Sequence, residues 1–165
     1  MASNYLSVGV EGFSFGFLTS DLEIDQDVCI SLARELGDAP WTFDAAFDHA
    51  LEASRAWRQA RQLPGLDGIH TSGAVRGMDA GFDDLLSMAT RDPVFADTAI
   101  AAAGTRPEHV PWLVRAGITR VHLGASVRPG GSWAKAHVDP GFVRSWRRLL
   151  DDAFASSTRS SGVTG

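Results

Sequence analysis

The chain has 165 residues, of which 44% are hydrophobic and 21% are charged, and its formal net charge is −5 at pH 7. This length and composition are typical of one soluble globular domain with its own hydrophobic core. The longest basic cluster is the pair Arg147-Arg148, so nucleic acid and anionic membranes are excluded as expected partners.

Two features indicate the compartment. Cys29 is the single cysteine, so no internal disulfide can form, which favours a reducing environment. The first basic residue is Arg34, so the N-terminus lacks the positive region of a signal peptide. No apolar run approaches the roughly 18 residues that a membrane span requires. We therefore expect a cytoplasmic protein without a membrane span.

Five short apolar runs predict β-strands. The first, residues 12–18, alternates large and small side chains, which is typical of a strand buried on one face. Four more runs follow at residues 40–43, 68–71, 98–102 and 119–123. Each pair of neighbouring strands is separated by enough chain for one helix.

Helical patterns fill these intervals. Apolar residues recur at helical spacing over residues 28–36, and Gly37 supplies a left-handed stop. The same spacing predicts helices over residues 50–60 and 82–89.

Sequence signals also mark the last two helices. Thr105 and Glu108 have the spacing of a capping box at the start of a fourth helix. Asp139 and Pro140 suit the N-cap and the first position of the last helix. The tail, residues 155–165, is rich in Ser, Thr and Gly, and we expect it to be disordered.

Alternating strands and helices predict parallel βα units and an α/β fold. A closed (β/α)₈ barrel takes about 250 residues and at least about 200, so this chain is too short for one. Its single domain, residues 1–154, is therefore predicted to be a partial TIM barrel of about five units. An open doubly wound parallel sheet is the alternative.

Four segments resemble the CutC family of copper-homeostasis proteins, which are TIM barrels. They are GFSFGFLTSDLEID (12–25), WTFDAAFD (41–48), LDGIHTSGA (66–74) and AAAGTRPEHVPWLVRAGITRVHLGAS (101–126). The resemblance covers roughly residues 5–135 and implies copper as a ligand. Compared with the family pattern, three N-terminal βα units are absent.

An unclosed barrel has consequences for assembly. Unpaired strand edges and an exposed inner face favour self-association, so we expect a homo-oligomer. A truncated family member without activity is a further interpretation, and the sequence assigns no reaction.

Candidate ligand-binding residues follow the strands, because TIM-barrel sites lie at the carboxyl ends of the strands. Strand alternation directs Asp44, His70 and His122 toward the barrel interior, where they would form an acid/base or ligand-orienting set. Thr71, Ser72 and Gly73 then form the rim loop. The alternative is that both histidines are hydrogen-bonded core or rim residues.

Two glycine turns suggest a small anionic or phosphorylated ligand. Gly104 and Gly124 follow the fourth and fifth strands, where barrels often bind phosphate through backbone N–H groups and a helix N-terminus. The alternative is that Gly104 only supplies turn geometry.

The two carboxylates of WTFDAAFD carry different expectations. Asp48 matches the family motif and suits the N-cap of the helix over residues 50–60. Asp44 and Ala45 stand where the family has His and Arg. If the family site binds an anion through that pair, this chain should bind the anion less well.

Copper is implied by the resemblance alone. Cu(I) prefers sulfur ligands, and the sulfur-bearing residues are Cys29, Met1, Met78 and Met88. Cys29 lies on the apolar stripe of its helix, so core packing is favoured over metal binding there.

Overall fold

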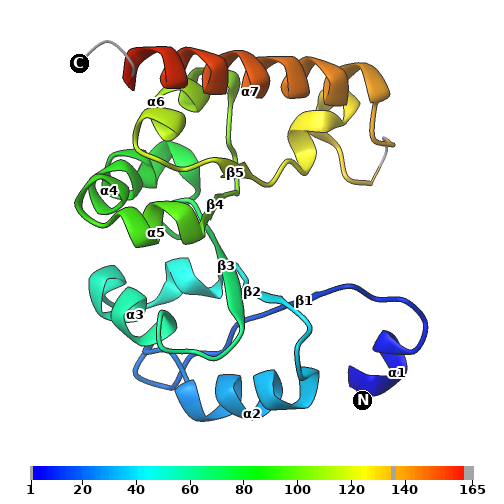
Figure 1. Ribbon diagram of the computed structural model, residues 1–165, viewed down its shortest axis with the longest axis vertical. Helices are drawn as coiled ribbons and strands as arrows, with labels where there is room; N and C mark the ends of the chain where they lie inside the picture. Colours follow the sequence, from blue (N-terminus) through cyan, green and yellow to red (C-terminus); the bar gives the residue numbers. More distant parts are fainter. Residues whose placement is uncertain (1, 135–136, 162–165) are drawn as a thin grey trace.

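The computed structural model describes residues 2–134 and 137–161 (Figure 1). Its five strands form one parallel sheet in the order β1-β2-β3-β4-β5. The strands are β1 (Phe13–Phe15), β2 (Trp41–Phe43), β3 (Leu66–Thr71), β4 (Ala99–Ala101) and β5 (Arg120–Val121). All five lie within or directly beside the predicted runs.

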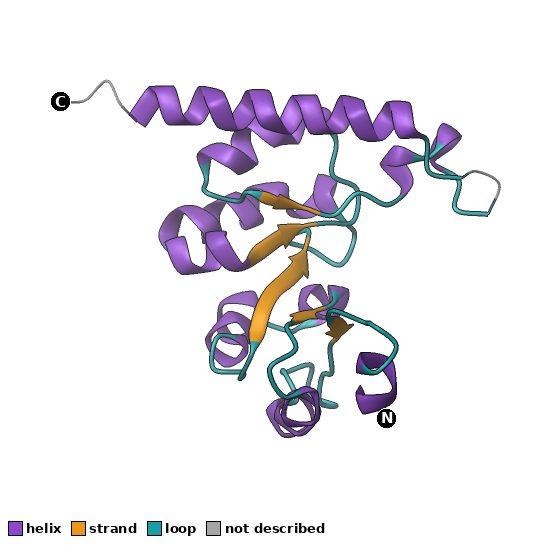
Figure 2. Cartoon of the chain, turned by 45° about the vertical axis from the view of Figure 1, so that its right-hand side comes forward, coloured by secondary structure: helices purple, strands orange, loops and turns teal. Residues whose placement is uncertain are grey.

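Helices connect the strands and cover one face of the sheet (Figure 2). The α-helices are α1 (Ala2–Leu6), α2 (Gln26–Leu36), α3 (Ala53–Ala60), α4 (Met78–Arg91), α5 (Pro93–Thr98), α6 (Val110–Arg115) and α7 (Pro140–Ser161). Short 3₁₀ helices are η1 (Ala45–His49), η2 (Pro107–His109), η3 (Ala125–Val127) and η4 (Pro129–Gly131). None of the helices in the described residues is long and apolar enough to cross a membrane.

The strand order confirms the partial barrel. In a doubly wound sheet the strand order reverses at a switch point, whereas here each strand pairs only with its neighbours in the sequence. Sequential parallel pairing is the arrangement of a TIM barrel. The barrel is not closed, and β1 and β5 are the two edges of the sheet.

The main core lies between the sheet and its helices. Trp41, Phe43 and Ile69 point from β2 and β3 into this layer and are almost completely buried. The rings of Phe15 and Trp41 stack with centroids 4.1 Å apart, and the indole N–H of Trp41 donates to the Pro64 carbonyl at 2.9 Å. The alternation that buries these residues directs their neighbours toward the barrel interior.

The Arg120 side chain forms hydrogen bonds and an ion pair at the amino-terminal end of the sheet. Its Nη2 donates to the carbonyls of Asp67 at 2.6 Å and Thr98 at 2.8 Å, and its Nη1 pairs with the Asp67 carboxylate at 2.8 Å. Gly68 leaves room for this side chain, because a Cβ there would lie 2.9 Å from Nη2. The guanidinium therefore fixes β3 and β5 relative to α5.

The starts of two helices differ from the predictions. Helix α3 begins at Ala53 with Glu52 as its N-cap, so Asp48 is not the cap; it lies one element earlier, in η1. Thr105 makes no capping box: within the described residues its Oγ1 has no partner, Arg106 is the N-cap of η2 with its N–H donating to Nδ1 of His109, and the regular helix begins only at Val110.

The last helix agrees with the prediction at its start and differs at its end. Oδ1 of Asp139 accepts from the N–H groups of Gly141 at 2.6 Å and Phe142 at 3.0 Å, as an N-cap does. Helix α7 continues to Ser161, so residues 155–161 of the expected disordered tail are helical. Residues 162–165 lie outside the described part of the chain.

Candidate functional site

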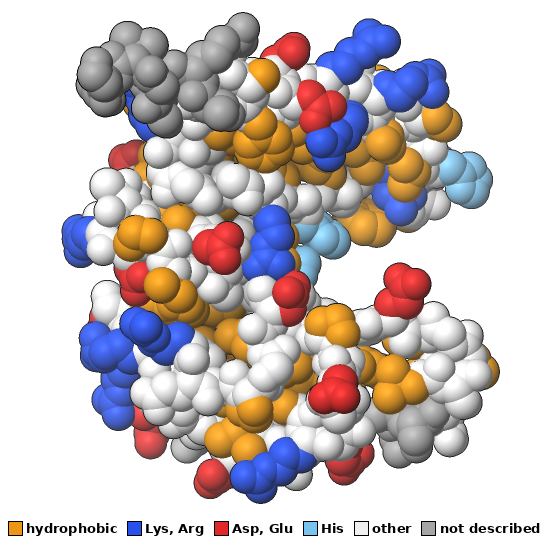
Figure 3. All heavy atoms as spheres, viewed as in Figure 1, with side chains coloured by type: hydrophobic (Ala, Val, Ile, Leu, Met, Phe, Trp, Pro, Cys, Tyr) orange, Lys and Arg blue, Asp and Glu red, His pale blue; other side chains and the backbone are white. Residues whose placement is uncertain are grey.

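A cavity of about 420 Å³ opens at the carboxyl ends of the strands. Figure 3 shows the molecule hollowed on this side, with histidine side chains beside the hollow. Residues from all five strand ends line the cavity: Ser14, Asp44, Ala45, His70, Ala102, Ala103, Gly104, Thr105, His122, Gly124, Ala125, Ser126 and Trp133. The volume is within the range of pockets for small molecules, about 300–1,000 Å³.

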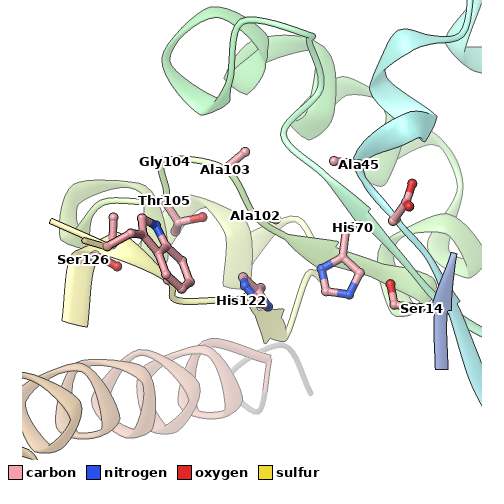
Figure 4. A pocket seen from close by; sticks show the side chains of 13 residues that line it. Ser14, Ala45, His70, Ala102, Ala103, Gly104, Thr105, His122 and Ser126 are labelled. Carbon is pink, nitrogen blue, oxygen red and sulfur yellow. The ribbon is translucent and has the colours of Figure 1, made fainter. Parts of the chain in front are cut away.

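His70 and His122 meet at the centre of this cavity (Figure 4). Their ring centroids lie 5.1 Å apart at an interplanar angle of 74°. Burial lowers the pKa of His70, the neighbouring His122 and Arg120 lower it further, and Asp44 opposes the shift. His70 is therefore neutral at pH 7 and both donates and accepts hydrogen bonds.

The lowered pKa of His70 predicts a pH dependence of stability. As the pH falls below 6.5, the ordinary pKa of histidine, the unfolded chain takes up a proton that folded His70 resists. The groups facing His70 are His122, Asp44 and Arg120. We expect His70→Gln to lose less stability than the unmodified chain between pH 7.5 and pH 5.5, roughly across the ordinary histidine pKa. Urea unfolding at both pH values measures this, and equal losses in the two proteins would contradict it.

Asp44 directly follows β2 and lines the cavity next to Ala45, which Figure 4 shows on the opposite side of the histidines from Gly104 and Thr105. Its Oδ1 accepts from the Ala46 N–H at 2.8 Å, and its own N–H donates to the Phe15 carbonyl at 3.1 Å. Gly16 leaves space for the carboxylate, since a Cβ there would lie 2.5 Å from Oδ1. The aspartate therefore caps η1 while remaining on the cavity wall.

The turn after β4 has an unusual backbone and an unpaired hydroxyl. Ala103 and Gly104 adopt positive φ angles of 51° and 103°. Thr105 is only 3% exposed, and within the described residues its Oγ1 has no hydrogen-bond partner. In the same part of the chain no protein group accepts from the N–H of Gly104 or Thr105. The turn therefore gives the cavity wall a buried hydroxyl that has no partner within the described residues.

Trp133 forms the wall beside the turn after β5. Gly124 allows its approach, because a Cβ on Gly124 would lie 2.5 Å from Cζ2 of the indole. The Arg128 guanidinium stacks over the same ring, 4.4 Å from its centroid. The glycine that the sequence assigns to an anion turn thus also accommodates an aromatic side chain.

The other predicted rim residues form a separate cluster outside the cavity, in which Thr71 and Ser72 are buried and Asp48 and Gly73 are half-buried. Asp48 accepts from the Thr71 hydroxyl at 2.5 Å, and from the Ser72 N–H at 2.8 Å and hydroxyl at 2.7 Å. Thr71 and Ser72 are each 1% exposed. Gly73, at φ 83°, packs against α4, where a Cβ would lie 2.1 Å from the Gly81 carbonyl oxygen. These four residues hold the rim loop in place and do not line the cavity.

Comparison with known proteins shows to which family the chain belongs. The model of the CutC family matches residues 3–127. The chain belongs to the CutC family. A CutC family protein of Klebsiella pneumoniae (strain 342) is 30% identical over 160 residues, which cover 96% of this chain and 60% of the relative. One of Photorhabdus laumondii is 32% identical over 121 residues, which cover 72% and 47%.

This CutC-family chain therefore spans about half to three fifths of the relatives it matches. Among solved structures, one titled "Native KDPGal structure" aligns with a TM-score of 0.51 at 16% identity. The alignment covers 96% of this chain and 63% of that one. At this identity the likeness shows the fold alone, and it agrees with the partial barrel.

The residues present do not fit the copper that CutC resemblance implies. Cys29 is completely buried, and burial raises the pKa of its thiol, which opposes the thiolate that binds metal. Met78 is 1% exposed within the same core, and Met88 packs against that core from α4. Among the described residues, no three His, Cys, Asp or Glu side chains gather to hold a metal ion.

The sequence directed attention to five of the cavity residues, namely Asp44, His70, Gly104, His122 and Gly124. The two proposed phosphate turns also contain Thr105 and Ser126, although Thr105 was in addition interpreted as part of a capping box; Ser14 and Trp133 were missed. Strand alternation offers a signal for Ser14, which pairs in register with Thr42 and so shares its face. No pattern in the sequence predicts that the Trp133 indole contacts Gly124.

Proposed function

We propose that the chain binds a small phosphorylated or otherwise anionic ligand in the cavity at the carboxyl ends of its strands. The anionic group lies at the turn formed by Ala103, Gly104 and Thr105. The single observation that carries this proposal is the buried hydroxyl of Thr105, which lines the cavity without a hydrogen-bond partner among the described residues.

A buried hydroxyl without a partner is costly. Leaving a polar group unsatisfied in the interior costs about 1–3 kcal/mol, and nearly all buried polar atoms in native proteins have a partner. A phosphate oxygen would accept from this hydroxyl and from the N–H groups of Gly104 and Thr105. A bound ligand that supplies the missing acceptor would explain why the Thr105 hydroxyl is buried without a partner among the described residues.

The donors at this turn are neutral. Among the residues that the structure describes, no lysine or arginine lines the cavity, and the 3₁₀ helix η2 after the turn has only three residues. Within the described part of the chain, the anion site therefore consists of hydroxyl and N–H groups. We expect modest affinity for inorganic phosphate, and higher affinity for a ligand that also contacts the histidines.

Thr105→Val tests the proposal because binding and stability should change in opposite directions. Valine keeps the shape and removes the hydroxyl, so the free energy of unfolding without ligand should rise by about 1 kcal/mol. Phosphate affinity should fall about tenfold, the value of one hydrogen bond to a charged acceptor. Isothermal titration with inorganic phosphate and urea unfolding without phosphate measure the two effects.

The matched control is Thr90→Val on the exposed side of α4. The Thr90 hydroxyl already donates to the Leu86 carbonyl at 2.8 Å, far from the cavity in the fold. This variant should bind phosphate as the unmodified chain does. Unchanged phosphate affinity in Thr105→Val, with the protein folded, would rule out an anion at this turn.

Copper handling is a second candidate, favoured by membership of the CutC family. Because Cys29 lies inside the core, we expect Cys29→Ala to leave Cu(I) affinity unchanged under reducing conditions. Competition with a Cu(I) chelator measures this affinity in both proteins. A tenfold or larger loss in Cys29→Ala, on the scale of one lost metal ligand, would restore copper as a ligand of this residue.

Two other expectations stay predictions. One is the cytoplasmic location, which the single cysteine favours. The other is self-association through the β1 and β5 edges, which light scattering of the purified chain would detect.

A further inference from the structure

We propose that the ligand of this cavity is a phosphorylated polyhydroxy compound, with its phosphate at Thr105 and its hydroxyl groups at Asp44. The inference rests on the anion site proposed above and adds the chemistry of the rest of the ligand. Its basis is that one end of the cavity offers hydrogen-bond donors and the other end offers a hydrogen-bond acceptor.

The Thr105 end offers donors. The hydroxyls of Thr105 and Ser126 line it together with Gly104, and no carboxylate lies among the lining residues of these two turns. Phosphate oxygens only accept hydrogen bonds, so they require such donors. Fully ionised phosphate would therefore be directed to this end.

The Asp44 end offers an acceptor. An ionised carboxylate accepts hydrogen bonds and donates none. Oδ1 of Asp44 is occupied by the Ala46 N–H, while no group in the described ranges donates to Oδ2. The carboxylate repels a phosphate and favours a neutral group that donates, and a hydroxyl is the simplest of these. Ser14, on the same wall, adds a hydroxyl that both donates and accepts.

The histidines occupy the space between the two ends. Figure 4 shows His70 and His122 between Thr105 and Gly104 on one side and Ser14 and Ala45 on the other. A neutral imidazole donates through one nitrogen and accepts through the other, which suits the hydroxyls of a polyol chain. Inorganic phosphate would occupy only one end of the 420 Å³ cavity, so a longer ligand makes more contacts.

The test compares three probes by isothermal titration: inorganic phosphate, ribose 5-phosphate and ribose. We expect the unmodified chain to bind ribose 5-phosphate at least about tenfold tighter than inorganic phosphate, because sites built to hydrogen-bond hydroxyls discriminate strongly against ligands that lack them. Ribose should bind more weakly than either probe, because it lacks the charged acceptor for the turn at Thr105. Asp44→Asn keeps the Oδ1 acceptor for Ala46 and removes the charge. It should weaken ribose 5-phosphate about tenfold and leave inorganic phosphate equal or tighter.

Ser14→Ala is the second variant, because Ser14 is exposed on β1 and its loss leaves the core unchanged. It should weaken ribose 5-phosphate alone, by roughly threefold, the value of one neutral hydrogen bond. Equal affinity of the unmodified chain for phosphate and ribose 5-phosphate would overturn this inference and leave the anion site standing. An equal loss of both probes in Asp44→Asn would also overturn it. No phosphate binding at all would overturn the anion site and this inference together.

Discussion

Replacing Asp48 with alanine is expected to lower the free energy of unfolding by about 3 kcal/mol. The carboxylate accepts from Thr71 and Ser72, which are each 1% exposed, so water cannot replace it as an acceptor. The Ser72 hydroxyl still has the Ala74 carbonyl at 2.9 Å, but the Thr71 hydroxyl and the Ser72 N–H are left buried without an acceptor. Each orphaned group costs about 1–3 kcal/mol.

Urea unfolding followed by circular dichroism measures this loss. Asp83→Ala is the matched control, because Asp83 is exposed on α4, and surface substitutions change stability by about 0.5 kcal/mol or less. If Asp48→Ala were as stable as this control, the carboxylate would not be the acceptor on which the rim loop depends.

Gly81→Ala is the second large effect, and its sign is opposite to what helix propensity predicts. In an exposed helix interior this substitution stabilises by about 1 kcal/mol. Here the new Cβ would lie 2.3 Å from the Ala74 N and 2.5 Å from the Ser72 carbonyl oxygen, both backbone atoms. Since backbone on the facing loop cannot rotate away, α4 or the loop must shift, and we expect a loss of about 3 kcal/mol.

The thermal midpoint of Gly81→Ala should therefore fall by several degrees, because about 1 kcal/mol shifts a domain of this size by roughly 2–4 °C. The exposed Ala80, next to it on α4, provides the contrast: Ala80→Gly should cost only the helix propensity of about 1 kcal/mol. A higher midpoint in Gly81→Ala than in the unmodified chain would show that the loop yields without strain.

Much of the fold could be predicted from the sequence, because burial repeats with the period of each element. Trp41 and Phe43 face the helices, so the residues between and after them face the barrel interior, and the same rule placed His70 and His122 together. The family motifs gave the partial barrel, since they match in order along most of the chain.

The remaining site could not be predicted, because it depends on contacts between distant segments. Asp48 has the residue type and position of a helix cap, and only the approach of η1 to the end of β3 makes it the acceptor for Thr71 and Ser72. Thr105 lies in a turn that the sequence assigns to phosphate, but its spacing with Glu108 also suggests a capping box; in the structure Arg106 is the N-cap of η2 and Thr105 lines the cavity.

The sequential strand order also determines how this sheet assembles from the unfolded chain. Phe13 pairs with Trp41 and Ile100 with Arg120, so every strand pairing joins segments separated by a single connection. Each parallel pairing requires the intervening connection to close first, and this loop-closure entropy is lost before the strand contacts form, so the sheet is expected to fold more slowly than a bundle of local helices. Because each pairing spans only one connection, a βα unit needs only its predecessor in place to pair its strand.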